Sequence, residues 1–173
     1  MADQLRYNTG KPQYHYWYST RLAAFLQNEA GLCSEDDGPV SAEAAAADRL
    51  LRHLTDWLNG QIEHRDLIRY WYDVSFELGL SLPSLYTEVC EYGASKYARG
   101  NFRKGQSVCH YAACAIRHLK LRIGEQALDT ESGKTHFGHA WWNIAQIFEI
   151  MEQPEVAALR DDRLFKHGDL SGR

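Results

Sequence analysis

The chain has 173 residues, of which 45% are hydrophobic and 24% charged; this suits one globular domain and excludes a chain that is disordered by composition. Its formal net charge of −4 excludes the global basic field of proteins that bind nucleic acid polymers, so an anion site must come from a local cluster. From this charge we do not expect a nucleic acid polymer as partner. No stretch approaches the roughly 18 apolar residues of a membrane span, so we do not expect a membrane as partner either.

The first residues and the cysteines both indicate the cytoplasm. Met1 to Gln4 is polar and lacks a basic region followed by an apolar run, which is the pattern of a signal peptide. The cysteines are Cys33, Cys90, Cys109 and Cys114, and no pair has the Cys-x-x-Cys spacing of a zinc or redox site. We therefore expect reduced, mostly buried thiols in a reducing compartment.

Helical periodicity recurs along the chain, whereas no sustained alternation of β-branched residues predicts a strand. In chain order we expect helices over 16–28, 41–59, 65–78, 83–96 and 107–123, then a sixth that follows the loop 125–133 and that Pro154 ends or kinks. Ser41 and Ser107 are expected N-caps, and the helix after Ser107 is apolar on most sides, which is typical of a central helix. The sequence thus predicts an all-α bundle of about six to seven helices.

The first candidate site is the segment Gly93 to Gly105, in which glycines alternate with cations. Lys96, Arg99, Arg103 and Lys104 can bind phosphates, and the segment leads to a helix N-terminus, where backbone N–H groups favour anions. A solvated basic loop explains the same spacing equally well.

The second candidate is a polar stripe in the sixth predicted helix. His136, His139, Asn143 and Gln146 share one side of it, next to the Trp141-Trp142 pair. Burying such a stripe is costly without partners, so it indicates a polar pocket between helices. Each histidine by itself also fits an ordinary hydrogen-bonded core position.

Carboxylates form the third candidate. Glu88 and Glu91 lie on neighbouring positions of one helix face, and Glu149 and Glu152 repeat the spacing. Paired carboxylates together with a nucleotide phosphate suit magnesium, although the pattern is also common on solvated helices. Arg117 lies in a mostly apolar helix and needs an anionic partner, either an acidic side chain or a ligand phosphate.

Several of these segments, taken in order, resemble a known family. They are Arg6-Tyr7-Asn8-Thr9-Gly10-Lys11-Pro12, Tyr92-Gly93-Ala94-Ser95-Lys96-Tyr97, Asn101-Phe102-Arg103-Lys104-Gly105, Arg117-His118-Leu119, and Asp129-Thr130-Glu131-Ser132-Gly133 with His136, His139 and Asn143 after it. Their order and spacing resemble the phage-encoded dATP/dGTP diphosphohydrolase N-terminal family, which is similar to the all-α, MazG-like nucleotide pyrophosphohydrolases. The chain departs from the family at Phe102, where tryptophan is usual, and in some sixty extra residues after the Gly-Lys-Pro segment.

The resemblance implies a single MazG-like domain over 1–173, with a helical insertion at 19–80, core nucleotide-binding helices at 81–153 and a flexible tail at 166–173. It implies Glu88, Glu91, Asp129 and Glu131 as ligands of Mg²⁺ or Mn²⁺, with Glu149 and Glu152 as the alternative to the second pair. Glu88, Glu91, His136 and His139 are the catalytic candidates. The nucleotide would be bound by Lys11, Lys96, Tyr97, Arg99, Asn101, Arg103, Lys104, Arg117, His118, Trp142 and Asn143.

The implied activity is metal-dependent conversion of a dNTP to a dNMP and pyrophosphate, in the cytoplasm of a phage-infected host cell. Two alternatives stay open at this stage. One is a non-catalytic protein that sequesters a host nucleotide signal, and the other is a structural protein whose polar residues are all satisfied internally. Several helices carry apolar residues on more than one face, so we also expect a homo-oligomer.

Overall fold

A computed structural model describes residues 41–99 and 105–164. The expected helix at 16–28, the candidates Lys11, Asn101, Arg103 and Lys104, and the expected tail at 166–173 lie outside this described part. Within it the fold is all-α, as predicted. No strand forms there, and the only β-type pairing is an isolated bridge between Leu128 and Thr135.

The helices of the described part are α2 (Ala42–Leu58), α3 (His64–Glu77), α4 (Leu82–Tyr97), α5 (Val108–Ile123), α6 (His136–Met151) and α7 (Pro154–Arg160). The helices α2 to α6 begin and end close to the predicted positions, and α7 was not predicted. The predicted caps are confirmed, since Ser41 accepts a hydrogen bond from the Ala44 N–H and Ser107 accepts one from the His110 N–H. Pro154 lies in the first turn of α7, where its missing N–H costs nothing.

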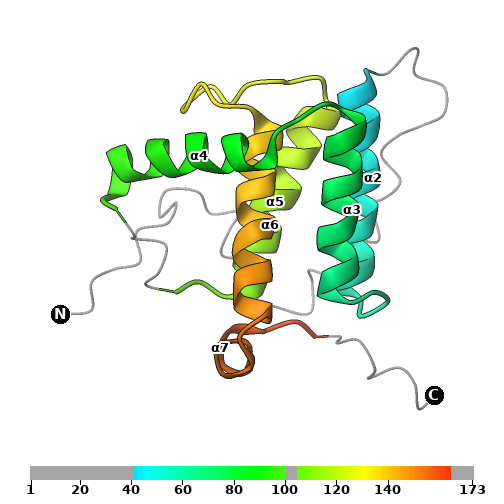
Figure 1. The fold of residues 1–173 in the computed structure, drawn as a ribbon, viewed down its shortest axis with the longest axis vertical. Helices are drawn as coiled ribbons and strands as arrows, with labels where there is room; N and C mark the ends of the chain where they lie inside the picture. Colours follow the sequence, from blue (N-terminus) through cyan, green and yellow to red (C-terminus); the bar gives the residue numbers. More distant parts are fainter. Residues whose placement is uncertain (1–40, 100–104, 165–173) are drawn as a thin grey trace.

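α5 is the central helix, as its mostly apolar surface predicted. It packs against α2 on one side and α6 on another, while α3 covers α2 and α6, and α4 packs against α6 (Figure 1). The core holds large side chains that are almost fully buried, among them Leu50, Trp57, Trp71, Leu119 and Ile144. In the described part no helix is long and apolar enough to cross a membrane.

α4 has a different direction from its neighbours. In Figure 1 it lies across the end of α6, whereas α2, α3, α5 and α6 run roughly alongside one another. Its first half is anchored in the core through Leu82 and Leu85, and the indole N–H of Trp141 donates a hydrogen bond of 3.0 Å to the Leu82 carbonyl. The second half extends past the bundle, so a concave space lies between it and the polar ends of α5 and α6.

Candidate functional site

A pocket of about 660 Å³ occupies that space. Its walls come from the second half of α4, from α5, from α6 and from the turn that joins α5 to α6. Aromatic side chains form much of the wall, and they are Tyr86, Tyr92, Tyr97, Tyr111 and Trp142. The volume lies in the range of ligand pockets, about 300–1,000 Å³, and suits a nucleotide.

The cationic residues that line the pocket are Lys96, Arg99 and Arg117. Lys96 forms an ion pair with Glu131 and lies over the ring of Tyr97, 5.1 Å from its centre. Burial lowers the pKa of Lys96, but its hydrogen bonds with Glu131 and Tyr97 outweigh burial and raise that pKa above its ordinary value. Lys96 is therefore cationic at neutral pH, and an incoming phosphate must compete with Glu131 for it.

Three histidines meet where α5 passes the start of α6. The rings of His118 and His139 stack with centroids 4.6 Å apart and planes 9° apart, and Nδ1 of His118 lies 2.9 Å from Nδ1 of His136. Nη2 of Arg117 donates to Nε2 of His118 at 2.7 Å. Since a guanidinium can only donate, we assign the His118 proton to Nδ1, from which it is donated to Nδ1 of His136.

The environment of His136 and His139 favours their neutral forms. Burial, with the nearby Arg117 and His136, lowers the pKa of His139 to about 4 against the opposing charge of Asp129. Burial also lowers the pKa of His136, and Arg117 and Arg122 act in the same direction. At pH 7 His139 is thus a hydrogen-bonding partner rather than a cation that could neutralise a phosphate.

The turn between α5 and α6 places Asp129 beside the histidines. The Asp129 N–H donates to the Lys134 carbonyl and the Asp129 carbonyl accepts from the Gly133 N–H, both at 2.8 Å; Gly133 has the positive φ of 67° that such a turn requires. Oδ2 of Asp129 accepts from the Ser132 N–H at 3.0 Å. Burial raises the pKa of Asp129, but the hydrogen bonds from Ser132 and the nearby His139 and Arg117 together bring it below its ordinary value, so the carboxylate is charged.

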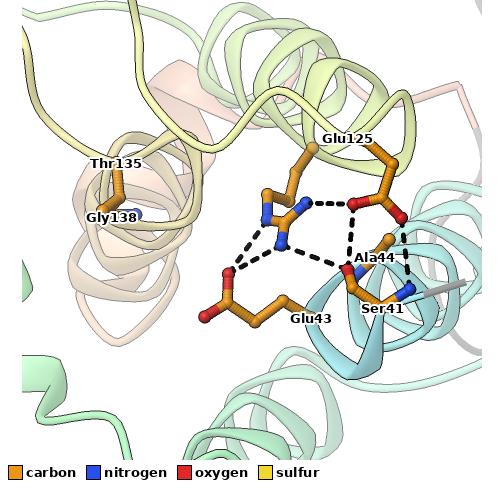
Figure 2. Close-up of polar contacts among 7 residues, drawn as sticks. Ser41, Glu43, Ala44, Glu125, Thr135 and Gly138 are labelled. Carbon is orange, nitrogen blue, oxygen red and sulfur yellow. Dashed lines mark hydrogen bonds and ion pairs between the residues drawn. The ribbon is translucent and has the colours of Figure 1, made fainter.

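Ser132 also connects the turn to α6. Its Oγ accepts from the Lys134 N–H at 3.1 Å and lies 2.7 Å from Nε2 of His139, which can donate its proton to this oxygen and then leaves Nδ1 of His139 unprotonated. Thr135 caps α6 by accepting the Gly138 N–H at 3.0 Å, a contact drawn in Figure 2. Both ends of the turn are therefore held before any ligand binds.

The pocket gathers most of the described residues proposed from the sequence. Glu91, Lys96, Tyr97, Arg99, Arg117, His118, Asp129, Glu131, His139, Trp142 and Asn143 all line it. Glu88 does not line the pocket, although its neighbour on the helix face, Glu91, does. His136 lies outside the lining and is 2% exposed, but its Nδ1 lies 2.9 Å from that of His118, which lines the pocket.

Other lining residues were not identified from the sequence. His110, Tyr111 and Cys114 face the pocket from α5, and Cys90 faces it from α4, where its sulfur accepts the indole N–H of Trp142 at 3.2 Å. A signal for the first group was present, because positions 110, 114, 117 and 118 share one helix face. This signal was not recognised because apolar residues surround these positions on α5.

One family matches the sequence, the family described as dATP/dGTP diphosphohydrolase, N-terminal, over residues 83–161. This segment contains α4 from its second residue through α7 and, with them, each described residue that lines the pocket. No curated protein matches the chain, and no solved structure matches it.

Proposed function

Because residues 83–161 match the dATP/dGTP diphosphohydrolase N-terminal family, we propose that this protein hydrolyses a deoxynucleoside triphosphate in the pocket between α4, α5 and α6. The products are a nucleoside monophosphate and pyrophosphate. One observation carries the proposal: the matched segment is the part of the chain that builds the pocket, whose described lining runs from Tyr86 to Asn143.

The lining of the pocket offers both cations and aromatic rings to such a substrate. Lys96, Arg99 and Arg117 offer positive charge to the triphosphate, and charge-assisted hydrogen bonds are among the strongest that a protein makes. Trp142 and Tyr97 offer aromatic surface to the base, where stacking contributes roughly 1–3 kcal/mol per base in proteins that bind nucleic acids.

The reaction is a displacement at the α-phosphorus. A water oxygen bonds to this phosphorus, the bond from it to the oxygen that bridges to the β-phosphorus breaks, and pyrophosphate leaves with the bonding electrons. Neutral His139, held by Ser132, can accept the proton that water releases and return it to solvent. Arg117 and Lys96 offset the negative charge that develops on the leaving pyrophosphate.

We propose that Mg²⁺ or Mn²⁺ accompanies the triphosphate. Mg²⁺ usually keeps water and phosphate ligands and takes only one or two protein carboxylates. Glu91 lines the pocket and can supply such a carboxylate, whereas Glu131 is paired with Lys96 and Glu88 lies off the pocket. When bound, the ion would neutralise phosphate charge.

The setting of the activity is also part of the proposal. The resemblance supports a phage-encoded, MazG-like enzyme of the host cytoplasm. The exposed face of α3 supports a homo-oligomer, because Tyr72 is 56% and Phe76 is 88% exposed there. Light scattering during gel filtration measures the mass of the assembly.

A substrate panel tests the activity. dATP, dGTP, the pyrimidine dNTPs and the ribonucleotides are incubated with the protein, with and without Mg²⁺ or Mn²⁺, and the products are separated by ion-exchange chromatography. We expect a purine deoxynucleotide to yield its monophosphate and pyrophosphate in the presence of an ion. Arg117→Gln should reduce kcat/KM about 10-fold or more, since a charged hydrogen bond contributes about 1.5–3 kcal/mol.

Arg69→Gln is the matched control, since Arg69 is exposed on α3 and pairs with Asp66, three positions before it on the same helix, at 2.6 Å. It should leave kcat/KM unchanged. Absence of hydrolysis across the whole panel contradicts the proposal. If a nucleotide is instead depleted from solution and returns intact when the protein is denatured, the protein sequesters it.

A further inference from the structure

His118 and His136 face each other through the nitrogens that metal ions use. Their Nδ1 atoms are 2.9 Å apart, and the side chains are buried, with residue exposures of 4% and 2%. Only one proton can lie between two nitrogens at this distance, so each ring directs a nitrogen at the same small space. A metal ion can take the place of that proton.

Asp129 completes the group. One nitrogen from each histidine and one carboxylate oxygen of Asp129 all lie within 4.8 Å of one another, and no other set of three histidine, cysteine or acidic residues in 41–99 and 105–164 comes together in this way. The carboxylate is oriented by the Ser132 N–H, and the backbone returns to α6 through the hydrogen bond from the His136 N–H to the Ala127 carbonyl at 2.9 Å. The donors are thus positioned by the turn itself.

We propose that His118, Asp129 and His136 bind a divalent transition-metal ion, at a site distinct from the Mg²⁺ that would enter with a nucleotide. Two imidazoles and one carboxylate are the ligands of catalytic zinc and of non-haem iron, whereas Mg²⁺ and Ca²⁺ prefer oxygen ligands only. The proposal stands on these contacts and does not depend on whether the protein hydrolyses a nucleotide.

The adjustment that the ion requires is small. Two nitrogens bound at about 2.0–2.1 Å in tetrahedral geometry lie about 3.3 Å apart, so the rings must separate by about 0.4 Å from their present distance. His136 keeps its assigned tautomer, because its Nδ1 already accepts. His118 changes tautomer, since coordination through Nδ1 moves its proton to Nε2.

The change of tautomer in His118 also alters a hydrogen bond of Arg117. Nε2 of His118 now accepts from Nη2 of Arg117 at 2.7 Å, and once Nε2 carries a proton it can no longer accept this bond. The ion therefore redirects the Arg117 guanidinium, which lines the pocket. The charge of Arg117 opposes a second cation nearby, and the Asp129 carboxylate offsets that repulsion.

Metal binding is measured directly, on tag-free full-length protein stripped with a chelator and dialysed. Co²⁺ is the probe because its visible absorption reports nitrogen and oxygen ligation, and isothermal titration gives stoichiometry and affinity. We expect one ion per chain and displacement of Co²⁺ by Zn²⁺. Losing even a partner that supports a ligand typically costs about 10–100-fold in affinity, so Asp129→Asn and His136→Gln should each weaken binding at least about 10-fold.

The matched control is His53→Gln, which removes a half-buried histidine of α2 far from the site in the chain and should leave Co²⁺ binding unchanged. Circular dichroism and thermal unfolding establish whether each variant is folded. If the His136→Gln variant does not fold, the Asp129→Asn variant alone tests the proposal. Wild-type protein that binds neither Co²⁺ nor Zn²⁺, or binding that survives in the folded Asp129→Asn variant, overturns the proposal. Neither outcome depends on the nucleotide assay.

Discussion

Arg122→Met should destabilise the protein, because Arg122 joins the end of α5 to the start of α2. Arg122 is 6% exposed. Its guanidinium donates to Glu43 at 3.0 Å, to Glu125 at 3.3 Å and to the Ser41 hydroxyl at 3.2 Å. Figure 2 shows Ser41, Glu43 and Glu125 gathered around this point, with Glu125 also accepting from the Ser41 backbone and hydroxyl. Methionine keeps much of the side-chain volume and removes the charge.

The magnitude follows from the exposure of the partners. Breaking a fully buried pair costs about 3–5 kcal/mol, whereas an exposed pair contributes about 0.2–1 kcal/mol. The side chain of Arg122 is 7% exposed, but those of Glu43 and Glu125 are 44% and 53% exposed, so water can solvate the carboxylates that are left behind. About 1 kcal/mol for each carboxylate gives a loss of about 2 kcal/mol.

Urea denaturation followed by circular dichroism measures this difference. For a chain of this size, a loss of about 2 kcal/mol corresponds to a fall in Tm of about 4–8 °C. Arg49→Met is the control, because Arg49 and Glu77 pair at 2.8 Å with side chains 45% and 55% exposed, and its loss should stay below about 1 kcal/mol. The reasoning is refuted if Arg122→Met unfolds within about 0.5 kcal/mol of wild type or no more easily than Arg49→Met.

Three further predictions concern stability. Thr135→Ala removes the cap of the Gly138 N–H and should cost about 1 kcal/mol in urea denaturation, with Thr135→Ser close to wild type; equal losses in both would contradict the capping role. Ile144→Ala leaves a cavity in the core, because Ile144 is 0% exposed, and should lower the free energy of unfolding by about 2–5 kcal/mol. A loss below about 1 kcal/mol would show that the core collapses into the cavity. Hydrogen bonds from Arg65 and His64 bring the pKa of Glu152 below its ordinary 4.5, so this carboxylate stabilises the fold above about pH 4.5 and less as pH falls through its lowered pKa. Glu152→Gln should therefore differ from wild type in unfolding free energy at pH 7 and converge with it in acid, and a difference that persists unchanged in acid would count against the linkage.

Part of the predicted set of polar residues lines one pocket because helices bring together residues that are three or four positions apart. His139 and Asn143 share the pocket as their spacing indicated, and the amide N–H of Asn143 donates to the His139 carbonyl at 2.8 Å. The same reasoning could not separate Glu88 from Glu91, since both flank one stripe and only the angle of α4 directs Glu91 to the pocket. It also could not show that His136 contacts His118, because that contact joins two helices.

The sequence by itself determined the helices, their ends and the all-α class, because caps, periodicity and turn residues act within a few positions along the chain. Ser41, Ser107 and Gly124 stand next to the helix ends that they predicted. Only the tertiary structure decided that α4 crosses the end of α6, that a pocket opens beneath it, and that Asp129 meets two histidines there. These features depend on how helices pack against one another, and packing is set by contacts between residues far apart in sequence.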